Sequence, residues 1–583
     1  MKFTGIAVSP GIGIGPIRCL QREEFVVREA PLPPERIEPE LLRFREAVEA
    51  SRQDIARIRD GIAAELGEHE AGIYDAHLMM LDDPELLSAV EHAVRGEHRD
   101  PGYAFGRYMA SVATRLEAVD DEYLRERRSD VLDVERRVLR HLLGGSRASF
   151  KLEQPAVIVA HDLGPSDVAL LKRDLVLGLV TEVGGRTSHS AIVARGRGIP
   201  AVVNVQGILQ KASNSRMGVV DGSAGVVEID PDPETGTRYR VRRDRFDEET
   251  RALREVRAEP AVTSDGRRID LGCNIELPSD AEGAVDVGAD SIGLFRTEFF
   301  YLNRLQLPTE EEQYEAYREV AERLAPRPVL FRTMDLGGDK VASYLGTTHE
   351  TNPFLGWRGI RFALHHPEVF RTQIRAIYRA SAHGRVRMMF PMVSSEEELL
   401  RAVAMCREVR ASLAAAGVPH DPELEIGVMV ETPSAVWLAD VLARTARFLS
   451  IGTNDLTQYT LAMDRDNERL AELYEPLHPA ILRSIHHTVE AGHRAGRWVG
   501  VCGEMAGDPR VAVLLVGLGV DEMSLAAVDL LRVKAAVRSV SYETAREVAR
   551  VALEQASAAD VRRVLAERVH PLLPEFLAVE RPS

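Results

Sequence analysis

Three hydrophobic patterns follow one another along the first 230 residues. The opening stretch, Thr4–Cys19, mixes strand-forming residues with Gly and Pro, which predicts a strand with tight loops. From about Leu32 to Leu143, apolar residues recur at helical spacing among many Ala, Arg and Glu residues, which predicts several long amphipathic helices. Between Pro155 and Ile229, short β-rich runs alternate with helical stretches. This third pattern predicts an α/β subdomain that the opening strand completes.

After Pro260 the pattern becomes a regular repeat of a short apolar run, in most cases followed by a helical stretch. The eight runs are RIDLGCNIE, SIGLFRTEF, PVLFRTMDL, RVRMMFPMV, EIGVMVETP, RFLSIGTNDL, WVGVCGEMA and DEMSLA. Strand–helix alternation repeated eight times is typical of a (β/α)8 barrel. The charged stretch before it has little apolar face, which indicates a solvated linker helix.

The predicted fold class is therefore a multidomain α/β protein: an α/β subdomain with an inserted helical bundle, then a C-terminal (β/α)8 TIM-type barrel. The predicted domain boundaries are residues 1–21 with 145–230 for the α/β subdomain, 22–144 for the helical subdomain, 231–260 for the linker helix and 261–575 for the barrel.

Polar residues stand at the ends of the apolar runs, where the active site of such a barrel lies. They are Glu276, Arg296, Arg332 with Asp335, Glu431, Asn454 with Asp455, and Cys502 with Glu504. Any one arginine or carboxylate could merely pair with another. A whole set at successive strand ends is hard to explain by packing alone, so we expect these groups to converge on one mouth of the barrel.

The chemistry of this set indicates a small, strongly anionic substrate. Guanidinium groups suit phosphate and carboxylate oxygens, and Arg358 and Arg465 follow in neighbouring motifs. Lys340 closes MDLGGDK, where two glycines let the backbone approach a ligand. Glu431 and Asp455 are oxygen donors of the kind that Mg²⁺ prefers. Metal and arginines together would stabilise a phosphoryl group during transfer.

Cys502 is open to two interpretations. Buried cysteines are often inert. Within VCGEMAGDP, at the end of a predicted strand, a role in proton transfer is favoured.

His189 stands between a Gly-rich turn and an apolar stretch in GGRTSHSAIVARGRGIPAV. Thr187 or Ser188 can cap the helix that follows, which places the imidazole in the first helical turn, where free N–H groups favour an anion. The neighbours supply hydroxyls and Arg186 but no further metal ligands. A packed structural histidine is the plainer alternative, whereas the setting favours a neutral imidazole that attacks phosphorus.

Charge and cysteine content narrow the class of protein. The formal net charge of −17 argues against nucleic acid as a partner, because backbone phosphates require a basic surface. The four cysteines (Cys19, Cys273, Cys406, Cys502) form no CxxC pair, which fits the reduced cytoplasm. The longest apolar run, Val511–Val520, is too short to cross a bilayer, and the N-terminus lacks the pattern of a signal peptide. No membrane insertion is expected.

The sequence resembles Enzyme I of the bacterial phosphotransferase system, the phosphoenolpyruvate–protein phosphotransferase family. GGRTSHSAIVAR resembles the phosphohistidine motif of the family. LFRTEF, RTMDLGGDK, NPFLGWRGIR, FPMV, SIGTNDLTQY and CGEMAGDP resemble successive barrel motifs in family order. The resemblance extends over essentially the whole chain.

The resemblance implies a role for each candidate residue. His189 is phosphorylated on Nε2, and Cys502 protonates enolpyruvate as pyruvate forms. The substrate's phosphate and carboxylate are held by Arg296, Arg332 and Arg465, with Asn454 beside them and Lys340 and Arg358 as helpers; Glu431 and Asp455 bind Mg²⁺.

The resemblance also implies partners. The helical subdomain would dock a small histidine-containing phosphocarrier protein, through an apolar face that is expected to include His77, Leu78, Met79 and Met80; ordinary helix packing is the alternative for each. The barrel would form a homodimer, and the α/β subdomain would carry the phosphohistidine.

Three other functions are alternatives. A dikinase or synthase that uses ATP needs a nucleotide-binding domain, for which the chain leaves no room. The same chemistry could feed a regulatory, nitrogen-type phosphorelay instead of sugar uptake. A non-catalytic interaction protein could have kept the fold, although His189, Glu431, Asp455 and Cys502 are all present.

Overall fold

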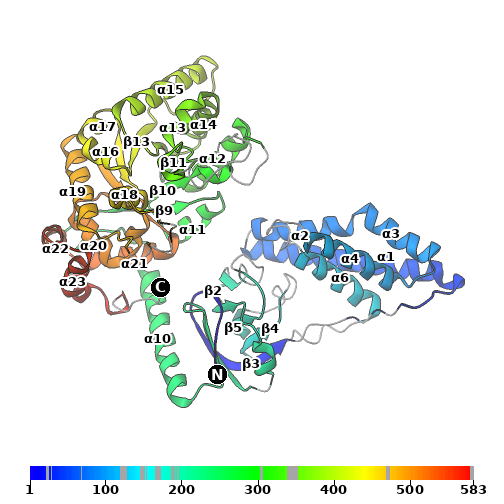
Figure 1. Ribbon diagram of the computed structural model, residues 1–583. Helices are drawn as coiled ribbons and strands as arrows, with labels where there is room; N and C mark the ends of the chain where they lie inside the picture. The colour runs from blue at the N-terminus through cyan, green and yellow to red at the C-terminus, as the bar shows by residue number, and fades with distance from the viewer. Residues whose placement is uncertain are drawn as a thin grey trace. The chain divides into compact units, whose positions relative to one another are not determined.

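The chain folds into two compact units, Met1–Glu248 and Glu249–Glu580 (Figure 1). The structure is a computed structural model that describes residues 1–583 apart from 21–24, 26, 28, 67, 118–127, 145–151, 153, 164–172, 186–190, 192–193, 196, 214, 302–305, 338–351, 466, 468–469, 471–472 and 578–583. Of residues 61–66, 68–73, 117, 129, 173 and 353 the backbone alone is described.

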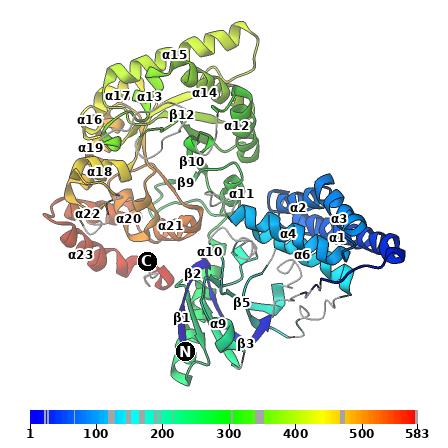
Figure 2. The ribbon, with the colours of Figure 1, turned by 45° about the vertical axis from the view of Figure 1, so that its right-hand side comes forward.

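The α/β part of the first unit is built on an eight-stranded sheet with the order β1-β8-β7-β3-β4-β5-β6-β2 (Figure 2). The strands are β1 Lys2–Thr4, β2 Ile6–Ser9, β3 Ile12–Leu20, β4 Ala156–Ala160, β5 Val176–Thr181, β6 Ala201–Val203, β7 Met217–Asp221 and β8 Val226–Ile229. Strand β3 pairs with β4 in parallel and with β7 antiparallel, so the opening segment completes the sheet as expected. The short helix α9, Ile208–Ala212, packs against it.

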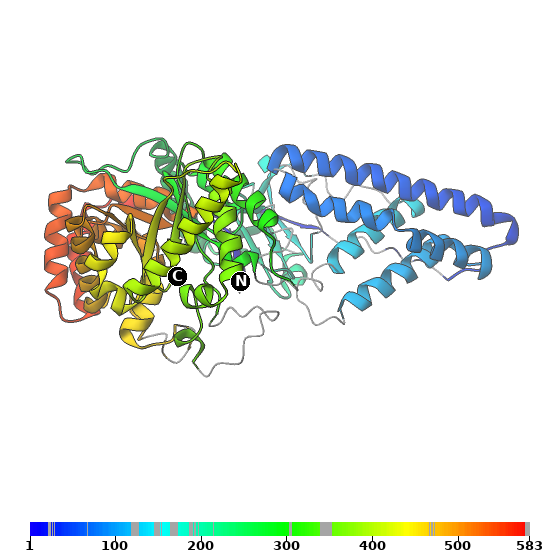
Figure 3. The same cartoon turned by 90° about the horizontal axis from the view of Figure 1, so that it is seen from above.

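Long amphipathic helices form the helical block of the first unit. They are α1 Ile37–Leu66, α2 Glu68–Leu81, α3 Pro84–Gly96, α4 Pro101–Glu117 and α6 Arg128–Leu143. Phe44, Val90, Phe105 and Val138 are among the buried side chains of their shared core. Figure 3 shows the long helices of this block, in blue, lying side by side.

Helix α10, Pro233–Glu255, follows the α/β part. Its sequence is dominated by charged residues, and most of its side chains are exposed or half-buried, because it offers little apolar surface to pack. Tyr239 is an exception: it is buried against Ile12 and Val219 of the sheet.

The second unit contains a closed barrel of eight strands, all paired in parallel, which confirms the predicted fold class. The strands are β9 Asp270–Ile275, β10 Ser291–Arg296, β11 Val329–Arg332, β12 Val386–Phe390, β13 Glu425–Val430, β14 Phe448–Ile451, β15 Trp498–Val501 and β16 Glu522–Leu525. Each of the eight apolar runs in the sequence contains one of them. Parallel strands that are buried on both faces need continuous apolar runs, which is why the eight strands could be recognised in the sequence.

Helices surround the barrel (Figure 1). They are α11 Asp280–Asp286, α12 Glu310–Leu324, α13 Ile360–His365, α14 Pro367–Ala380, α15 Glu396–Ala415, α16 Pro433–Trp437, α17 Ala439–Thr445, α18 Thr453–Leu461, α19 Pro479–Arg494, α20 Pro509–Gly517, α21 Ala527–Ser539, α22 Tyr542–Leu553 and α23 Ala558–Arg568. Two of them begin with complete capping boxes, Thr309 with Glu312 and Ser395 with Glu398. Each box satisfies amide groups that the first turn leaves without helical partners.

The interior of the barrel is filled by side chains and is not an open pore. Leu294, Leu330, Met389, Met429 and Phe448 form a buried cluster there with Cys502. A packed interior confines ligand binding to the ends of the strands. In the part of the chain that the structure describes, no helix combines the length and apolar character needed to span a membrane.

Candidate active site at the carboxyl end of the barrel

Two arginines end neighbouring strands of the barrel. Arg296 is the last residue of β10 and Arg332 the last of β11, and their Cα positions are paired across the two strands. Arg296 Nη1 donates to Glu276 Oε1 at 2.7 Å and keeps part of its side chain exposed. Both guanidinium groups therefore lie at the same edge of the barrel, as the sequence predicted.

Arg332 is buried, and carboxylates fix its orientation. Its Nη2 donates to Glu298 and its Nη1 lies 3.2 Å from Asp335 Oδ2. Its backbone carbonyl accepts from the hydroxyl of Thr297 at 2.7 Å. Burial alone would lower the pKa of Arg332, but Glu298 and Asp335 raise it overall, so the group stays a cation.

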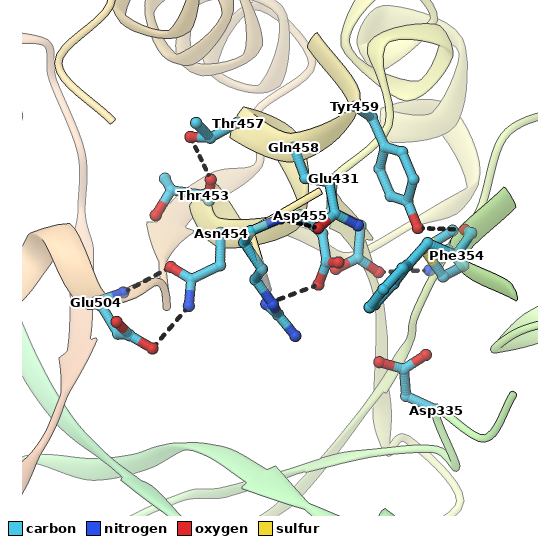
Figure 4. A network of polar contacts seen from close by, with 12 residues as sticks. Asp335, Phe354, Glu431, Thr453, Asn454, Asp455, Thr457, Gln458, Tyr459 and Glu504 are labelled. Atoms are coloured by element: carbon cyan, nitrogen blue, oxygen red, sulfur yellow. Dashed lines mark hydrogen bonds and ion pairs between the residues drawn. The ribbon is translucent and has the colours of Figure 1, made fainter. Parts of the chain in front are cut away.

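Arg358 joins two carboxylates of the site. Its Nε and Nη2 donate to the two oxygens of Asp335, each at 3.0 Å, and its Nη1 and Nη2 donate to Asp455 at 2.8 and 3.1 Å. Nη1 also donates to the hydroxyl of Tyr459 at 3.2 Å, which in turn donates to the carbonyl of Phe354 at 2.6 Å (Figure 4). Only 1% of Arg358 is exposed, so its guanidinium group forms a buried link between the carboxylates of Asp335 and Asp455.

Glu431 follows β13 and lies close to Asp455 (Figure 4). Its Oε1 accepts the backbone N–H of Met392 at 2.6 Å, whereas its buried Oε2 makes no hydrogen bond with any described residue. Burial, together with the charges of Asp455 and Asp335, raises the pKa of Glu431 to about 8, although Arg332 and Arg358 act in the opposite direction. A buried carboxyl held this way has a high affinity for a proton or a cation.

Gly452 makes room for this carboxyl. A Cβ atom at position 452 would lie 2.9 Å from Glu431 Oε2 and 3.1 Å from Glu431 Cβ. A larger residue would have to push the carboxylate aside.

Asn454 and Glu504 connect the ends of β14 and β15. Asn454 Nδ2 donates to Glu504 Oε1 at 2.9 Å, and its Oδ1 accepts the Glu504 backbone N–H at 3.1 Å (Figure 4). The hydroxyl of Tyr474 donates to the carbonyl of Asn454 at 2.7 Å. These contacts hold the amide side chain at the edge of the barrel. Arg465 Nη1 lies 4.0 Å from Asp455 Oδ2, which brings a further cation to the same place.

Cys502 is the first residue after β15 and caps the buried cluster inside the barrel. Its Sγ lies 3.7 Å from the carbonyl of Ile451. Burial raises the pKa of the thiol to about 11, so it carries its proton at neutral pH. This state suits a proton donor and not a thiolate nucleophile.

Comparison with known proteins decides the family. Family models for PEP-utilising enzymes match three segments: the PEP-binding domain at residues 250–542, the N-terminal domain at 4–127 and the mobile domain at 152–225. The chain is 42% identical over 558 residues to a phosphoenolpyruvate-protein phosphotransferase of Bacillus sp. (strain S), with 96% of each chain covered. The chain belongs to the phosphoenolpyruvate-protein phosphotransferase family.

Two further curated relatives carry the same name. The Geobacillus stearothermophilus protein of the same name is 42% identical and covers 96% of this chain and of its own. The Staphylococcus epidermidis protein is 44% identical over 519 residues, which is 89% of this chain and 91% of that protein. An NMR structure of Enzyme I is 36% identical and covers 42% of this chain and 99% of its own, with a TM-score of 0.37.

In this phosphotransferase-family chain, the structure brings eight of the ten predicted site residues together and does not describe the other two. At or just beyond the carboxyl ends of barrel strands lie Arg296, Arg332, Glu431, Asn454, Asp455 and Cys502. Arg358 and Arg465 come from the connecting segments and reach the same place through Asp455. His189 and Lys340 lie outside the described residues. The roles of these ten residues stay predictions.

Glu431 and Asp455 have the chemistry that the predicted Mg²⁺ site requires. Glu431 offers an oxygen without a hydrogen bond to the described residues, and Asp455 lies next to it. Both are hard oxygen donors, and two carboxylates with substrate oxygens are what Mg²⁺ usually takes. No group of three or more His, Cys, Asp or Glu residues that could hold a metal occurs among the described residues. The two carboxylates fit a cation whose coordination is completed by oxygens of the substrate.

Glu298 is a residue of the site that sequence reasoning missed. It is fully buried and pairs with Arg332. A signal was present, because Glu298 stands two residues after Arg296 in LFRTEF. A carboxylate directly after a buried strand is costly unless it has a cationic partner, and the next strand ends in one.

The predicted apolar face of the helical block needs one correction. His77 was expected on the exposed face of YDAHLMMLDDPEL, but it is 0% exposed, with Nε2 3.6 Å from Asp130 and Nδ1 3.9 Å from Asp133. Two buried carboxylates on α6 favour an interior imidazole over an exposed one. Met79 is 74% exposed, whereas Leu78 and Met80 are half-buried.

Proposed function

We propose that this protein transfers the phosphoryl group of phosphoenolpyruvate to its own His189 and then to a histidine of a small phosphocarrier protein, releasing pyruvate as the first step of the sugar phosphotransferase system. The observation that carries the proposal is the set of arginines and carboxylates at the carboxyl end of the barrel. It occurs in a chain that is 42% identical, over 96% of its length, to phosphoenolpyruvate-protein phosphotransferases.

Arginines of the site suit the two anionic groups of phosphoenolpyruvate. Arg332 is held as a cation by Glu298 and Asp335, so its fork is preorganised for oxygens of the substrate. Arg296 and Arg465 keep about a quarter of their side chains exposed (28% and 26%), so both can reach a ligand at the mouth. In the proposal these three hold the phosphate and carboxylate, with Asn454 beside them and Lys340 and Arg358 as helpers.

Glu431 and Asp455 are the residues proposed to hold Mg²⁺, which would neutralise charge on the phosphoryl oxygens when bound. Arg358 keeps Asp455 in place through two hydrogen bonds. Met392 does the same for Glu431 through its backbone N–H. The chain's own contacts thus fix both carboxylates before any ligand arrives.

The proposed reaction conserves bonds and protons. The bond between phosphorus and the enol oxygen breaks, and a bond from phosphorus to Nε2 of His189 forms. Cys502 gives its thiol proton to the methylene carbon of enolpyruvate, which becomes the methyl group of pyruvate, and the thiolate regains a proton from solvent. In the second half-reaction the bond from phosphorus to His189 breaks as one to the carrier's histidine forms.

The remaining parts of the proposal concern partners and compartment. The helical block would dock the carrier, and it presents exposed apolar side chains at Leu42 and Met79. The barrel would form a homodimer. The cytoplasm is the proposed compartment, because all four cysteines are free thiols, as in a reducing environment.

The test is the intact mass of the purified protein after incubation with phosphoenolpyruvate and Mg²⁺. The expected result is an acid-labile gain of one phosphoryl group, with one equivalent of pyruvate released. His189→Ala should abolish the gain. His161→Ala is the matched control: it removes another imidazole of the α/β part, one that contacts Glu182 at 2.8 Å, and should leave the gain intact.

The second half-reaction is tested by adding a purified histidine-containing carrier to the phosphorylated protein. Loss of the phosphoryl group from this chain and its appearance on the carrier are expected. No mass gain in the wild type, or an equal gain in His189→Ala, would overturn the proposal.

A further inference from the structure

A glutamine outside every predicted motif holds the backbone of the active site. Gln373 lies in the middle of α14, a helix on the outside of the barrel, and is 0% exposed. Its side chain reaches the segment Arg332–Asp335, where β11 has ended and the chain bends through the site. We propose that Gln373 is a positioning residue for phosphoryl transfer, acting through Thr297 and the backbone of Met334; this inference rests on the proposed function.

Hydrogen bonds fix how the amide of Gln373 is turned. The hydroxyl of Thr297 donates its one proton to the carbonyl of Arg332 at 2.7 Å. It must therefore accept from Gln373, whose Nε2 lies 2.8 Å away. The Oε1 atom is left to accept the backbone N–H of Met334 at 2.9 Å. The amide thus reaches the segment Arg332–Asp335 in two ways: directly at the N–H of Met334, and through Thr297 at the carbonyl of Arg332.

These two contacts hold a stretch that the sheet does not hold alone. Thr333 N–H still bonds to the carbonyl of Met389 at 2.9 Å, beyond the end of β11. Met334 N–H has turned away from the sheet and finds its partner in Gln373. On either side of this pair stand Arg332, which pairs with Glu298, and Asp335, which orients Arg358. If the backbone at Met334 were less well fixed, the positions of Arg332 and Asp335 would be less well fixed too.

The Nε2 atom of Gln373 also belongs to a hydrogen-bond network in the protein core. Its Nε2 also lies 3.3 Å from the hydroxyl of Tyr317, which donates to Gln313 Oε1 at 3.2 Å. Tyr301 donates to the same Gln313 oxygen at 2.9 Å. All four side chains are buried. A buried polar network is stable only when the hydrogen bonds of its members offset the cost of removing them from water. Each member therefore needs a partner, and this fixes one position for the Gln373 amide.

The network also supplies a matched control. Tyr301→Phe removes the hydrogen bond to Gln313, which belongs to the same buried network and is separated from Gln373 by Gln313 and Tyr317. Gln373→Met keeps the length and apolar volume of the side chain but removes both site contacts. Both variants should lower the unfolding temperature of the barrel, while their effects on catalysis should differ.

The first experiment measures the rate of phosphoenolpyruvate-dependent phosphorylation of the full-length chain. Gln373→Met should lower kcat/KM by about 10- to 100-fold, the scale expected when reacting groups are misplaced by about 1 Å. Tyr301→Phe should stay within about twofold of the wild type, since the hydrogen bond to Gln313 that it removes does not involve the site. Equal kcat/KM for Gln373→Met and Tyr301→Phe would overturn the inference.

A second pair of variants tests the route. Thr297→Val removes the hydroxyl and should lower kcat/KM in the same direction, whereas Thr297→Ser keeps it and should retain activity. The double variant Gln373→Met with Thr297→Val should lose no more than Gln373→Met alone, because both changes break one chain of contacts. Multiplicative losses would show that Gln373 does not act through Thr297. Thr297→Val also keeps the inference falsifiable if Gln373→Met fails to fold.

Hydrogen exchange separates this inference from the proposed function. In the full-length protein without substrate, the amide of Met334 should exchange faster in Gln373→Met than in the wild type and in Tyr301→Phe. Unchanged exchange would refute the positioning role even if phosphorylation is observed. If the wild type shows no phosphorylation, the proposed function fails, and the exchange rates alone then decide whether Gln373 holds this segment.

Discussion

Replacing Glu522 by Gln should remove a pH dependence from the stability of the barrel. Glu522 begins β16, at the end of the barrel opposite the candidate site, and only 5% of it is exposed. Burial raises the pKa of its carboxyl to about 7 from an ordinary 4.5; Arg387, whose Nη1 lies 3.5 Å away, lowers it, and Asp270 and Asp290 raise it. The folded state therefore keeps a proton that the unfolded chain has released between these two values.

The sign and size of the effect follow from linkage. Because the folded state binds more protons across this window, the free energy of unfolding falls as pH rises from 4.5 to 7. The stability that Glu522 contributes is complete below the lower value and is lost above the upper one. At ~1.36 kcal/mol per pKa unit, the loss is about 3 kcal/mol. Glu522→Gln has no titrating proton at this position, so its decline should be smaller than that of the wild type by this amount; Glu431, whose pKa is raised to about 8, contributes a decline in both proteins.

The assay is urea unfolding followed by tryptophan fluorescence at about pH 5 and about pH 8.5. These values lie near the lower and above the upper pKa of Glu522. All three tryptophans, Trp357, Trp437 and Trp498, lie in the second unit, so the signal reports on the barrel. Trp498 packs under the guanidinium of Arg387, 4.8 Å from its ring centre. This ring lies beside the perturbed carboxyl and is a local probe.

The control is Glu425→Gln. It removes the other carboxylate partner of Arg387, 2.8 Å away, from a half-exposed position. The decline between the two pH values should persist in it, because the buried carboxyl of Glu522 is still present. If Glu522→Gln and the wild type lose the same stability between the two pH values, burial does not keep this carboxyl protonated and the reasoning is refuted.

Three further predictions concern the candidate site. Gly452→Ala should raise the Mg²⁺ concentration for half-maximal phosphorylation about tenfold or more, because the new Cβ lies 2.9 Å from Glu431 Oε2 and displaces the carboxylate; a Mg²⁺ titration of the phosphorylation rate checks this, and an unchanged midpoint contradicts it. Cys502→Ala should slow pyruvate release by about 10²- to 10⁴-fold, the usual contribution of a general acid; in the wild type, whose thiol has a pKa of about 11, this step should show no thiol titration between pH 6 and 9, chosen as roughly the range below that value. Arg358→Lys should lower the free energy of unfolding of the barrel by about 3–5 kcal/mol, since an ammonium group cannot bridge two buried carboxylates; urea unfolding measures the loss, and a change below about 1 kcal/mol would show that the bridge is not needed.

The pattern of the sequence was sufficient for the barrel and for most of its mouth. A parallel strand buried on both faces must be apolar along its length, and a polar residue at its end is visible against that background. Arg296, Arg332 and Glu431 could therefore be found one strand at a time. The barrel topology then brings residues far apart in sequence to one edge, since parallel strands all end on the same side.

The sequence by itself determined the order of the elements, the fold class and the residues at the strand ends, because each of these depends on local periodicity and composition. Only the tertiary structure decided which partner each group has. Glu298, Gln373 and the buried position of His77 depend on side chains that approach from other helices and strands. Such contacts leave no periodic signal, because a buried polar residue is stabilised by whatever partner the fold places within hydrogen-bonding distance.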